Sequence, residues 1–299
     1  MIEKDDGPKR DSCRKSKPEW LRVKLTSGKH YFRLKQMIRE TSLHTVCEEA
    51  HCPNMAECWS RGTATFMILG NTCTRNCTFC AVKGGVPEPE DPGEPRRIAG
   101  AVDSMKLSHA VITSVTRDDL RDGGASMFAE TIAQIRTRVF GCTVEVLIPD
   151  FKGDIHALKK VIESQPEILG HNLETVPRLY QEIRTGAHYN RSLEILQTTK
   201  QESPNILIKS GIMVGLGEKP EELRAAMTHL REAGCDLITI GQYLQPTRRH
   251  RRVFRYYTPE EFERLKRSAQ DAGFLGIKSG PLVRSSYHAE EILRDLQHI

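Results

Sequence analysis

Residues 63–80 read TATFMILGNTCTRNCTFC, and this stretch decides the fold. Its first seven residues are apolar or β-branched, which predicts a short strand buried on both faces. A glycine and three cysteines follow, and Cys73, Cys77 and Cys80 have the spacing C-x3-C-x2-C. A loop that follows a parallel strand lies at the carboxyl edge of its sheet, where ligand sites collect. The stretch therefore predicts a parallel sheet with a cysteine site at this edge.

The rest of the chain repeats the strand signal. Five further apolar runs occupy residues 110–115, 143–148, 168–173, 206–214 and 237–240. Helical candidates lie near residues 125–138, 154–163, 177–184, 191–200 and 220–233. This alternation predicts βαβ units and an α/β fold with a parallel sheet. Six strands are too few for a closed eight-stranded barrel and suit an open, partial one, with a doubly wound sheet as the alternative.

Composition limits the class of protein. The chain has 299 residues, 38% hydrophobic and 28% charged, which suits one large domain with extensions. No run approaches the ~18 consecutive apolar residues of a membrane span. Residues 1–10 contain three acidic residues and no apolar core, so no secretory or transit peptide is predicted and we expect a cytoplasmic protein. The proline-rich segment 87–95, PEPEDPGEP, predicts a surface excursion without chemistry.

The number and clustering of the cysteines indicate a metal-binding site. Nine cysteines are present, and six of them fall between positions 47 and 80. An odd number without an export signal argues against a disulfide framework. Cys13, Cys142 and Cys235 are isolated, and the last two are predicted to be small buried hydrophobic residues.

Cys73, Cys77 and Cys80, called here the motif triad, can hold three irons of a 4Fe–4S cluster. The fourth iron is then open for S-adenosylmethionine. A structural zinc site would need paired C-x2-C knuckles and a fourth ligand in the same module, and neither is evident. The motif resembles the signature of the radical S-adenosylmethionine superfamily, which has an aromatic residue before the last cysteine, here Phe79.

Cys47, Cys52 and Cys58, called here the auxiliary triad, have the spacing C-x4-C-x5-C. His51 adjoins Cys52, which makes simultaneous binding awkward, so it is taken as a neighbour. The two triads, with GTATFMILG at residues 62–70 between them, resemble the lipoyl synthase family.

The resemblance covers nearly the whole chain. It extends to residues 113–120, 122–125, 171–176, 213–218, 241–246 and 281–288. One departure is visible: such enzymes usually read His-x-Pro-Val where this chain has His250-Arg-Arg-Val253. The missing proline affects the local loop geometry rather than the chemistry.

The resemblance implies a partial (β/α)6 barrel and a sulfur-inserting transferase of lipoate biosynthesis. The reaction it implies is radical-mediated insertion of two sulfur atoms at C6 and C8 of a protein-bound octanoyl-lysine. The implied cofactors are two 4Fe–4S clusters and S-adenosylmethionine. The motif triad would hold the radical-generating cluster, and the auxiliary triad would hold a cluster that donates its sulfide.

The resemblance also assigns a fourth ligand of the auxiliary cluster to the motif Arg284-Ser-Ser-Tyr287. By position this ligand is Ser286, with Ser285 as the fallback. From the residues alone, a serine pair here is better interpreted as the cap of a helix over residues 288–298. An alkoxide is poorly matched to cluster iron, so it suits a cluster that is taken apart during the reaction.

Four residues are candidate contacts for S-adenosylmethionine. Asn172 and Glu174 follow a predicted strand and could hold the ribose or methionine, or simply cap the strand end. Gly215 and Gly217 would let the backbone approach the adenine closely. Two arginines that could pair with a carboxylate, or be plain surface residues, are Arg117 and Arg184.

We predict three segments and a set of partners. The segments are an N-terminal arm with the auxiliary triad (1–60), the barrel (61–258) and a C-terminal extension with the serine ligand (259–299). The implied carriers are octanoylated lipoyl domains, such as 2-oxoacid dehydrogenase subunits and the glycine cleavage H protein. The implied electron donor is flavodoxin or ferredoxin, and no nucleic acid or membrane partner is expected.

Five arginines crowd into eight residues after the last predicted strand: Arg248, Arg249, Arg251, Arg252 and Arg255. A charge run is often a plain solvated face. Because this run follows a strand, it could face the barrel mouth, and we hypothesise that it docks an acidic lipoyl-carrier domain.

Two other functions compete with this interpretation. A methylthiotransferase acting on transfer RNA usually brings an N-terminal domain and an RNA-binding domain, whereas the arm here has about 60 residues. A ferredoxin-like electron carrier needs far less scaffold than six strands of βαβ pattern. Iron and sulfide counts of about eight each would support two clusters.

Overall fold

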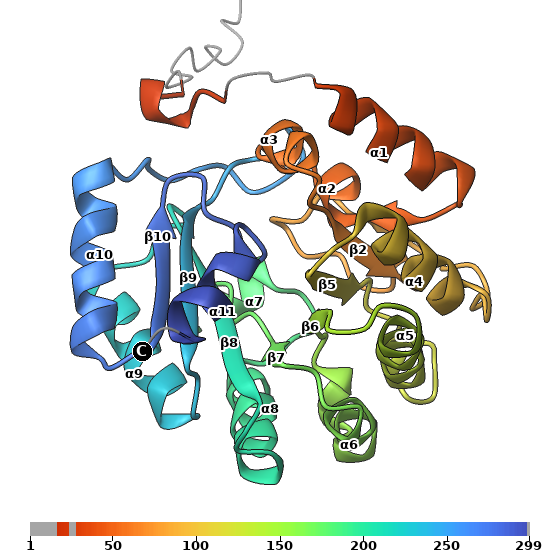
Figure 1. The fold of residues 1–299 in the computed structure, drawn as a ribbon. Helices are drawn as coiled ribbons and strands as arrows, with labels where there is room; N and C mark the ends of the chain where they lie inside the picture. The colour runs from red at the N-terminus through yellow and green to blue at the C-terminus, as the bar shows by residue number, and fades with distance from the viewer. Residues whose placement is uncertain (1–16, 24–27, 298–299) are drawn as a thin grey trace, which may run out of the picture.

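The computed structural model describes residues 17–23 and 28–297, and its centre is one eight-stranded sheet (Figure 1). The strand order is β1-β2-β5-β6-β7-β8-β9-β10. The bounds are β1 (His44–Thr45), β2 (Thr65–Ile68), β5 (His109–Ser114), β6 (Thr143–Leu147), β7 (Ile168–Gly170), β8 (Leu207–Val214), β9 (Leu237–Gln242) and β10 (Gly276–Gly280). Neighbours from β2 to β10 are parallel, and β1 pairs antiparallel with β2. A separate short pair joins β3 (Thr72–Cys73) to β4 (Lys83–Gly84).

The strand order follows the chain order from β2 to β10 without a reversal. A doubly wound sheet would reverse at a switch point, so that alternative is wrong and the sheet is of the barrel type. Within the described residues the order ends at β1 and β10, so the barrel stays open. The predicted partial α/β barrel is confirmed. The six predicted strands are present, and β10 adds a parallel strand that its sequence GIKSG, with no apolar run, did not predict.

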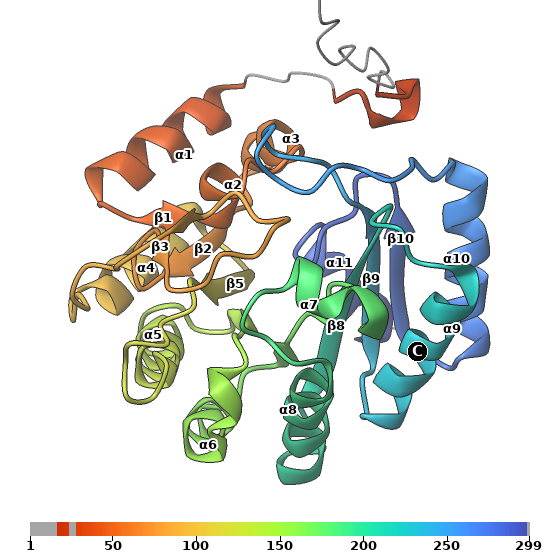
Figure 2. The same ribbon diagram turned by 180° about the vertical axis from the view of Figure 1, so that it is seen from behind.

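Helices cover the outer face of the sheet (Figures 1 and 2). In chain order they are α1 (Lys29–Glu40), α2 (Val46–Glu49), α3 (Met55–Ser60), α4 (Glu94–Met105), α5 (Ala125–Arg138), α6 (Ile155–Glu163), α7 (Tyr180–Ile183), α8 (Tyr189–Glu202), α9 (Pro220–Glu232), α10 (Pro259–Asp271) and α11 (Ala289–Gln297). Three 3-10 turns are η1 (Glu19–Leu21), η2 (Phe151–Gly153) and η3 (Pro177–Leu179). Helix starts follow local chemistry: α10 begins after Thr258 because Thr258 and Glu261 accept hydrogen bonds from each other's backbone N–H.

The predicted surface excursion over residues 87–95 is wrong for its last two residues, which belong to a buried helix start. α4 begins inside it at Glu94, with Pro95 in the first turn, where a helix needs no backbone N–H from that residue. The buried Glu94 carboxylate accepts a hydrogen bond from the N–H of Leu69 at 2.7 Å. This contact fastens α4 to the end of β2, directly before the loop of the motif triad.

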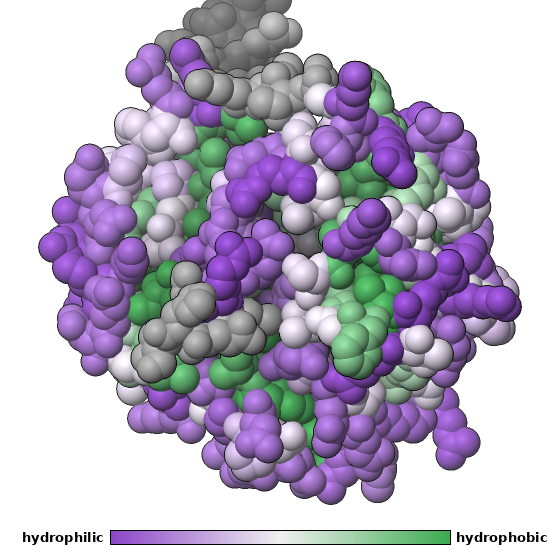
Figure 3. Space-filling model, in the orientation of Figure 1, coloured by the Kyte–Doolittle hydropathy of each residue, from purple (hydrophilic) through white to green (hydrophobic). Residues whose placement is uncertain are grey.

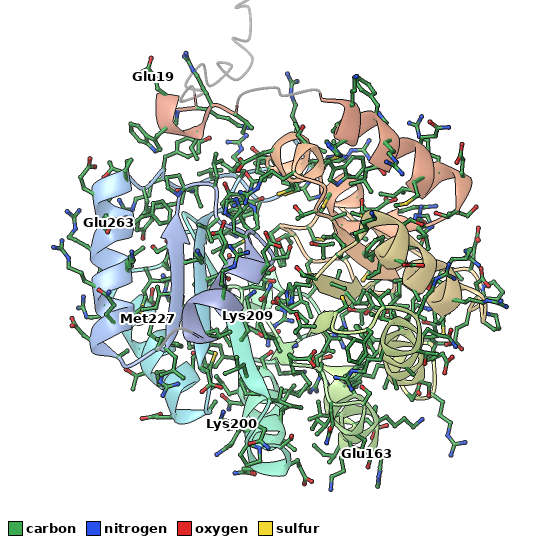
Figure 4. The ribbon with its side chains drawn as sticks, in the orientation of Figure 1. Glu19, Glu163, Lys200, Lys209, Met227 and Glu263 are labelled. Atoms are coloured by element: carbon green, nitrogen blue, oxygen red, sulfur yellow. The ribbon has the colours of Figure 1, made fainter. Side chains whose placement is uncertain are left out.

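Charged residues fill the amino-terminal half of the barrel interior. Lys209 Nζ lies 2.8 Å from Glu145 Oε1, and His109 Nε2 lies 3.6 Å from Glu145 Oε2. Figure 4 shows Lys209 on β8 in the middle of the sheet. Open space extends from His109 toward the carboxyl ends of the strands.

The C-terminal helix lies across the open side of the barrel (Figure 1). α11 contacts both β5 and β10, which lie near opposite ends of the strand order. Its Ile292 packs against Ile168 of β7 and Leu237 of β9. Hydrophilic side chains cover most of the face shown in Figure 3. None of the helices in the described ranges combines the length and apolar content that a bilayer span requires.

Candidate active site

A cavity of about 670 Å³ lies inside the barrel at the carboxyl ends of the strands. Its wall includes all six cysteines of the motif triad and the auxiliary triad. Phe79, Asn172, Glu174, Ser285 and Ser286 also line it. The structure therefore brings most of the predicted site residues, from both ends of the chain, onto one surface.

The loop of the motif triad is fastened to two neighbouring strands by one arginine. Arg75 forms ion pairs with Asp118 at 2.7 Å and Asp150 at 2.6 Å, beyond the ends of β5 and β6. Its side chain is 7% exposed and that of Asp150 is fully buried. Burial opposes the guanidinium charge, but the two carboxylates outweigh it and raise the pKa of Arg75. The backbone N–H of Arg75 donates to Cys73 Sγ at 3.4 Å, so this clamp fixes the cysteine loop directly.

The thiols of the motif triad are poorly placed to ionise without a positive partner. Burial raises the pKa of Cys77 to about 11 although the positive charge of Arg184 is nearby. Burial and the negative charges of Cys77 and Cys73 raise the pKa of Cys80 to about 12. Cluster iron supplies the positive charge that three crowded thiolates lack, so the donor set fits a cluster.

The thiolates of a 4Fe–4S cluster each bind a different iron, so they lie farther apart than the ligands of one ion. The described part of the chain contains no three His, Cys, Asp or Glu side chains grouped tightly enough to hold a single metal ion.

The auxiliary triad is carried by two short helices of the N-terminal arm and the turn between them. Cys47 lies in α2, which Thr45 caps by accepting the N–H of Glu48 at 3.3 Å, and Cys58 lies in α3. Burial and neighbouring thiolate charges raise the pKa of Cys47 to about 11 and that of Cys58 to about 12. Burial also raises the pKa of Cys52. This donor set has the same need for positive charge as the motif triad.

Ser286 lies beside the auxiliary triad. The Thr65 hydroxyl donates to Ser286 Oγ at 2.8 Å, and the Thr65 backbone hydrogen-bonds the Cys47 thiol. α11 begins at Ala289, so His288 rather than either serine precedes the helix. This geometry places Ser286 with the cysteines and does not support the helix-cap interpretation.

Residues 281–288, called here the C-terminal strap, cross the end of β9. A Cβ atom on Gly241 of β9 would lie 2.1 Å from the carbonyl oxygen of Val283, so only glycine leaves room for the strap. Asn54, in the arm, donates from Nδ2 to the carbonyl of Leu282 at 2.7 Å. The strap is thus positioned by one strand of the barrel and by the arm. The sequence marked residues 241–246 only as family-like, with no signal for this packing requirement.

Two of the candidate contacts for S-adenosylmethionine form one polar group. Asn172 Nδ2 donates to Glu174 Oε1 at 3.0 Å, and burial raises the pKa of Glu174. Arg184 donates to the carbonyl of Asn172 at 2.7 Å and also lines the cavity. Asn172 Oδ1 is buried and has no hydrogen-bond partner among the described residues. A polar ligand in the cavity can supply that partner, as S-adenosylmethionine would.

The structure leaves the other candidates off the wall of this cavity: Gly215, Gly217 and Arg117. A Cβ atom on Gly215 would lie 2.2 Å from the side chain of Gln242, so this glycine is required by packing. Arg117 is 2% exposed and pairs with Asp119 at 2.8 Å, so it is not a surface arginine. Cys142 and Cys235 are buried as predicted, whereas Cys13 lies outside the described residues.

Arg284 is a cavity residue that the sequence did not single out. It faces Cys52 of the auxiliary triad and Glu174 of the opposite wall, and burial lowers its pKa. Its Nη1 donates to the carbonyl of Val283 at 2.7 Å. A lone arginine before two serines has no spacing pattern, so only the fold shows that it lies near both Cys52 and Glu174.

Comparisons with known proteins agree with this site. The model of the Radical SAM superfamily matches residues 67–230, and the model of the N-terminal domain of lipoyl synthase matches residues 3–52. A lipoyl synthase of Rubrobacter xylanophilus is 57% identical over 94% of this chain and 88% of its own length. One of Oceanobacillus iheyensis is 54% identical over 92% and 88%, and one of Shouchella clausii is 51% identical over 99% and 95%.

Solved structures show the same fold at low sequence identity. Methylornithine synthase superimposes with a TM-score of 0.51 at 13% identity, over 92% of this chain and 93% of its own. Streptococcus suis SuiB bound to S-adenosylmethionine gives a TM-score of 0.56 at 11% identity, over 76% and 55%. The FeFe-hydrogenase maturase HydG gives 0.54 at 14% identity, over 91% and 65%.

Proposed function

The chain belongs to the lipoyl synthase family of radical S-adenosylmethionine enzymes, and from this we propose that its two triads and Ser286 hold the two 4Fe–4S clusters of the reaction. The activity is radical-mediated insertion of two sulfur atoms at C6 and C8 of a protein-bound octanoyl-lysine, with the auxiliary cluster as sulfur donor. The observation that carries this assignment is the single cavity whose wall holds both triads and the strap serine.

When bound, the motif cluster with S-adenosylmethionine supplies one-electron chemistry that breaks unactivated C–H bonds, and the auxiliary cluster supplies sulfide. The chain's own residues hold and orient these groups. The motif triad would hold the cluster through three of its irons, and the fourth iron would be open to S-adenosylmethionine. Asn172 and Glu174 orient its ribose and methionine. Its adenine side is assigned to Phe79, which lines the cavity.

The octanoyl chain needs an apolar, water-free path between the two clusters. The cavity wall supplies Met67 of β2, Val111 of β5, Leu147 of β6 and Ile212 of β8. Burial of each methylene stabilises the bound chain by about 0.8 kcal/mol. Hydrogen abstraction by a radical requires no general acid or base, so these side chains act by binding the chain and excluding water.

Ser286 is proposed as the replaceable ligand of the auxiliary cluster. The hydroxyl of Thr65 points at its oxygen, at 2.8 Å, and stabilises an alkoxide there by hydrogen bonding. Ser285 is the alternative ligand, and a comparison of the two alanine variants separates them.

The protein acts on lipoyl-domain substrates. We assign the carriers to octanoylated 2-oxoacid dehydrogenase subunits and the glycine cleavage H protein, the electron donor to flavodoxin or ferredoxin, and the location to the cytoplasm. The proposed division is an arm (1–60) with the auxiliary triad, a barrel (61–258) and an extension (259–299) with Ser286. The strap contacts of Asn54 and Thr65 support this division of labour, since they join the extension to the rest of the site.

Mass spectrometry tests the proposed function. An octanoyl-lysine peptide is incubated with anaerobically reconstituted protein, dithionite and S-adenosylmethionine. The expected product has gained two sulfur atoms, and the Ser286→Ala variant is expected to give far less of it than Ser285→Ala. A peptide that returns unchanged from protein loaded with about eight irons would contradict the assignment.

A further inference from the structure

The connection between β9 and α10 carries a loop, residues 247–255, called here the arginine loop. Figure 2 shows this connection passing across the carboxyl end of the sheet. The preceding residues, Leu244, Gln245 and Pro246, line the cavity. The arginine loop therefore stands at the rim of the site and connects its wall with the surface.

Hydrogen bonds fix the arginine loop to the loop of the motif triad. His250 Nε2 lies 2.8 Å from the carbonyl oxygen of Cys80, and the backbone N–H of Arg251 donates to the carbonyl of Thr78 at 2.9 Å. Tyr243 donates from its hydroxyl to the carbonyl of Arg251 at 2.7 Å. One imidazole ring thus separates the arginine loop from the backbone of a cluster ligand.

The five arginines of this loop divide into two sets. Arg251 pairs with Glu182 at 2.6 Å, and Arg255 pairs with Glu261 at 2.7 Å. The other three, Arg248, Arg249 and Arg252, are exposed, and none has a carboxylate within 4.0 Å among the described residues. The docking hypothesis for the whole run therefore applies to these three alone.

The same loop carries an exposed aromatic ring. Phe254 is 70% exposed, and its backbone N–H is held by the carbonyl of Gly215 at 2.8 Å. Three exposed cations and one exposed apolar ring on a loop with a fixed backbone suit the docking of an acidic protein. A plain solvated loop would need neither the fixed backbone nor the exposed ring.

We propose that Arg248, Arg249, Arg252 and Phe254 dock a small acidic one-electron carrier that reduces the cluster of the motif triad. This inference rests on the proposed function, because that cluster must be reduced before S-adenosylmethionine is cleaved. An electron donor must bring its redox centre close to the cluster, and the contact of His250 with Cys80 shows that this loop lies against the cluster-binding loop. A lipoyl carrier must instead bind where its octanoyl-lysine arm can enter the cavity, and a raised KM for that carrier is the result that would identify it.

The redox step is a single electron transfer. The reduced carrier loses one electron, the oxidised motif cluster gains it, and no proton or chemical group changes partner. The carrier then leaves in its oxidised form, which favours a weak, salt-sensitive complex over a tight one.

The test measures binding of oxidised flavodoxin to the reconstituted holoenzyme by titration calorimetry at several salt concentrations. In the variant Arg248→Ser/Arg249→Ser/Arg252→Ser, the Kd should rise about tenfold at low salt, and its salt dependence should become shallower. The matched control is Arg224→Ser/Arg264→Ser/Arg267→Ser, which removes the same charge from exposed positions on α9 and α10. Its Kd should equal that of the wild type.

Activity assays complete the test. Product formation driven by flavodoxin should fall in the loop variant, whereas product formation driven by dithionite should not change. The proposal is overturned by an unchanged Kd, by an equal loss in the control, or by normal flavodoxin binding with a raised KM for the octanoylated carrier. That last result would assign the loop to the lipoyl carrier. A wild type that makes no product with dithionite would instead contradict the proposed function, independently of the binding result.

Discussion

The motif triad and the auxiliary triad share a ligand chemistry but are built in opposite ways. The motif triad comes from one short loop, and a buried arginine clamps that loop to the ends of two strands through Asp118 and Asp150. The auxiliary triad comes from the arm, and its proposed fourth ligand, Ser286, is 221 positions away from its hydrogen-bond partner Thr65. Buried charge and local sequence fix the first site. Contacts between remote segments fix the second, both neutral ones such as Thr65–Ser286 and charged ones such as Arg61–Glu291.

This difference matches the proposed fates of the two clusters. A cluster that must survive every turnover benefits from ligands held by a rigid frame. A cluster that is consumed and rebuilt benefits from one ligand that can dissociate. The comparison predicts that changes in each site will affect different steps of the reaction.

Removal of one cysteine from each triad should give the largest effects. Cys52→Ala should reduce the iron content from about eight to about four, abolish sulfur insertion and leave cleavage of S-adenosylmethionine intact. Cys77→Ala should lose both activities. Iron analysis and chromatography of 5′-deoxyadenosine and product measure these outcomes. Equal loss of cleavage in both variants would show that the two sites do not work separately.

Arg75→Leu should remove the two ion pairs that hold the loop of the motif triad. It leaves the fully buried Asp150 carboxylate with Arg191, at 3.3 Å, as its remaining ion-pair partner, so the unfolding free energy should fall by about 3 kcal/mol. The matched control is Arg178→Leu, whose ion pair with Glu222 has a similar length, 2.7 Å, but an arginine that is 49% exposed. That change should cost much less, because the pair is open to solvent. Urea unfolding compares the two, and equal losses would show that burial does not strengthen the clamp.

The same clamp predicts a pH dependence. Burial opposes ionisation of Asp150, yet hydrogen bonds and charge from Arg75 lower its pKa from the ordinary 3.8 to about 2. A lowered pKa in the folded state means that the stabilisation is full above the unfolded pKa and is lost as the pH falls toward the folded one. The unfolding free energy of the wild type should therefore fall more steeply between pH 4 and pH 2 than that of Asp150→Asn. If the unfolding free energies of the two proteins fall in parallel with pH, Asp150 does not contribute to the loss of stability in acid.

Gly241→Ala should affect only the site of the auxiliary triad. The new methyl group would overlap the carbonyl of Val283, so the strap must move and carry Ser286 with it. Sulfur insertion should fall about tenfold, the effect of a small misplacement of a reacting group, while cleavage of S-adenosylmethionine stays unchanged. Gly100→Ala is the control, because a Cβ there meets its nearest atom at 3.6 Å. A parallel loss of both activities would show that the end of β9 supports both sites.

Thr65→Val should give the smallest change. It removes the hydroxyl that donates to Ser286 and keeps the side-chain shape, so the unfolding free energy should fall by about 1 kcal/mol. Thr137→Val removes an exposed hydroxyl that donates to its own helix and should have less effect. A loss of several kcal/mol at Thr65 would mean that the strap is held as firmly as the motif loop, and the contrast between the sites would disappear.

Local patterns allowed the barrel and both triads to be predicted from the sequence. The strands β2 and β5 to β9 are apolar runs, and the cysteine spacing is a one-dimensional signal. The polar strand β10 and the helix start at Glu94 depend on tertiary packing, and their segments have no clear period.

The supporting residues of the site could not be predicted for the same reason. Arg75, Thr65 and Gly241 act through partners that are 43, 221 and 42 positions away, or are required by the path of another segment. Ser286 was reached only through a family resemblance, because a serine before a helix is by itself a better signal for a cap. The division of the arginine run into paired and unpaired members likewise required the positions of Glu182 and Glu261.

The hydrogen bond between Thr65 and Ser286 joins two residues that the ribosome synthesises far apart in time. Ribosomes add about 5–20 residues per second, so roughly 10–40 s pass between synthesis of these two partners. During this interval the nascent polypeptide already contains both cysteine triads, but not the serine proposed as the fourth ligand of the auxiliary cluster. The proposed four-ligand auxiliary site can therefore form only after residue 286 has been synthesised.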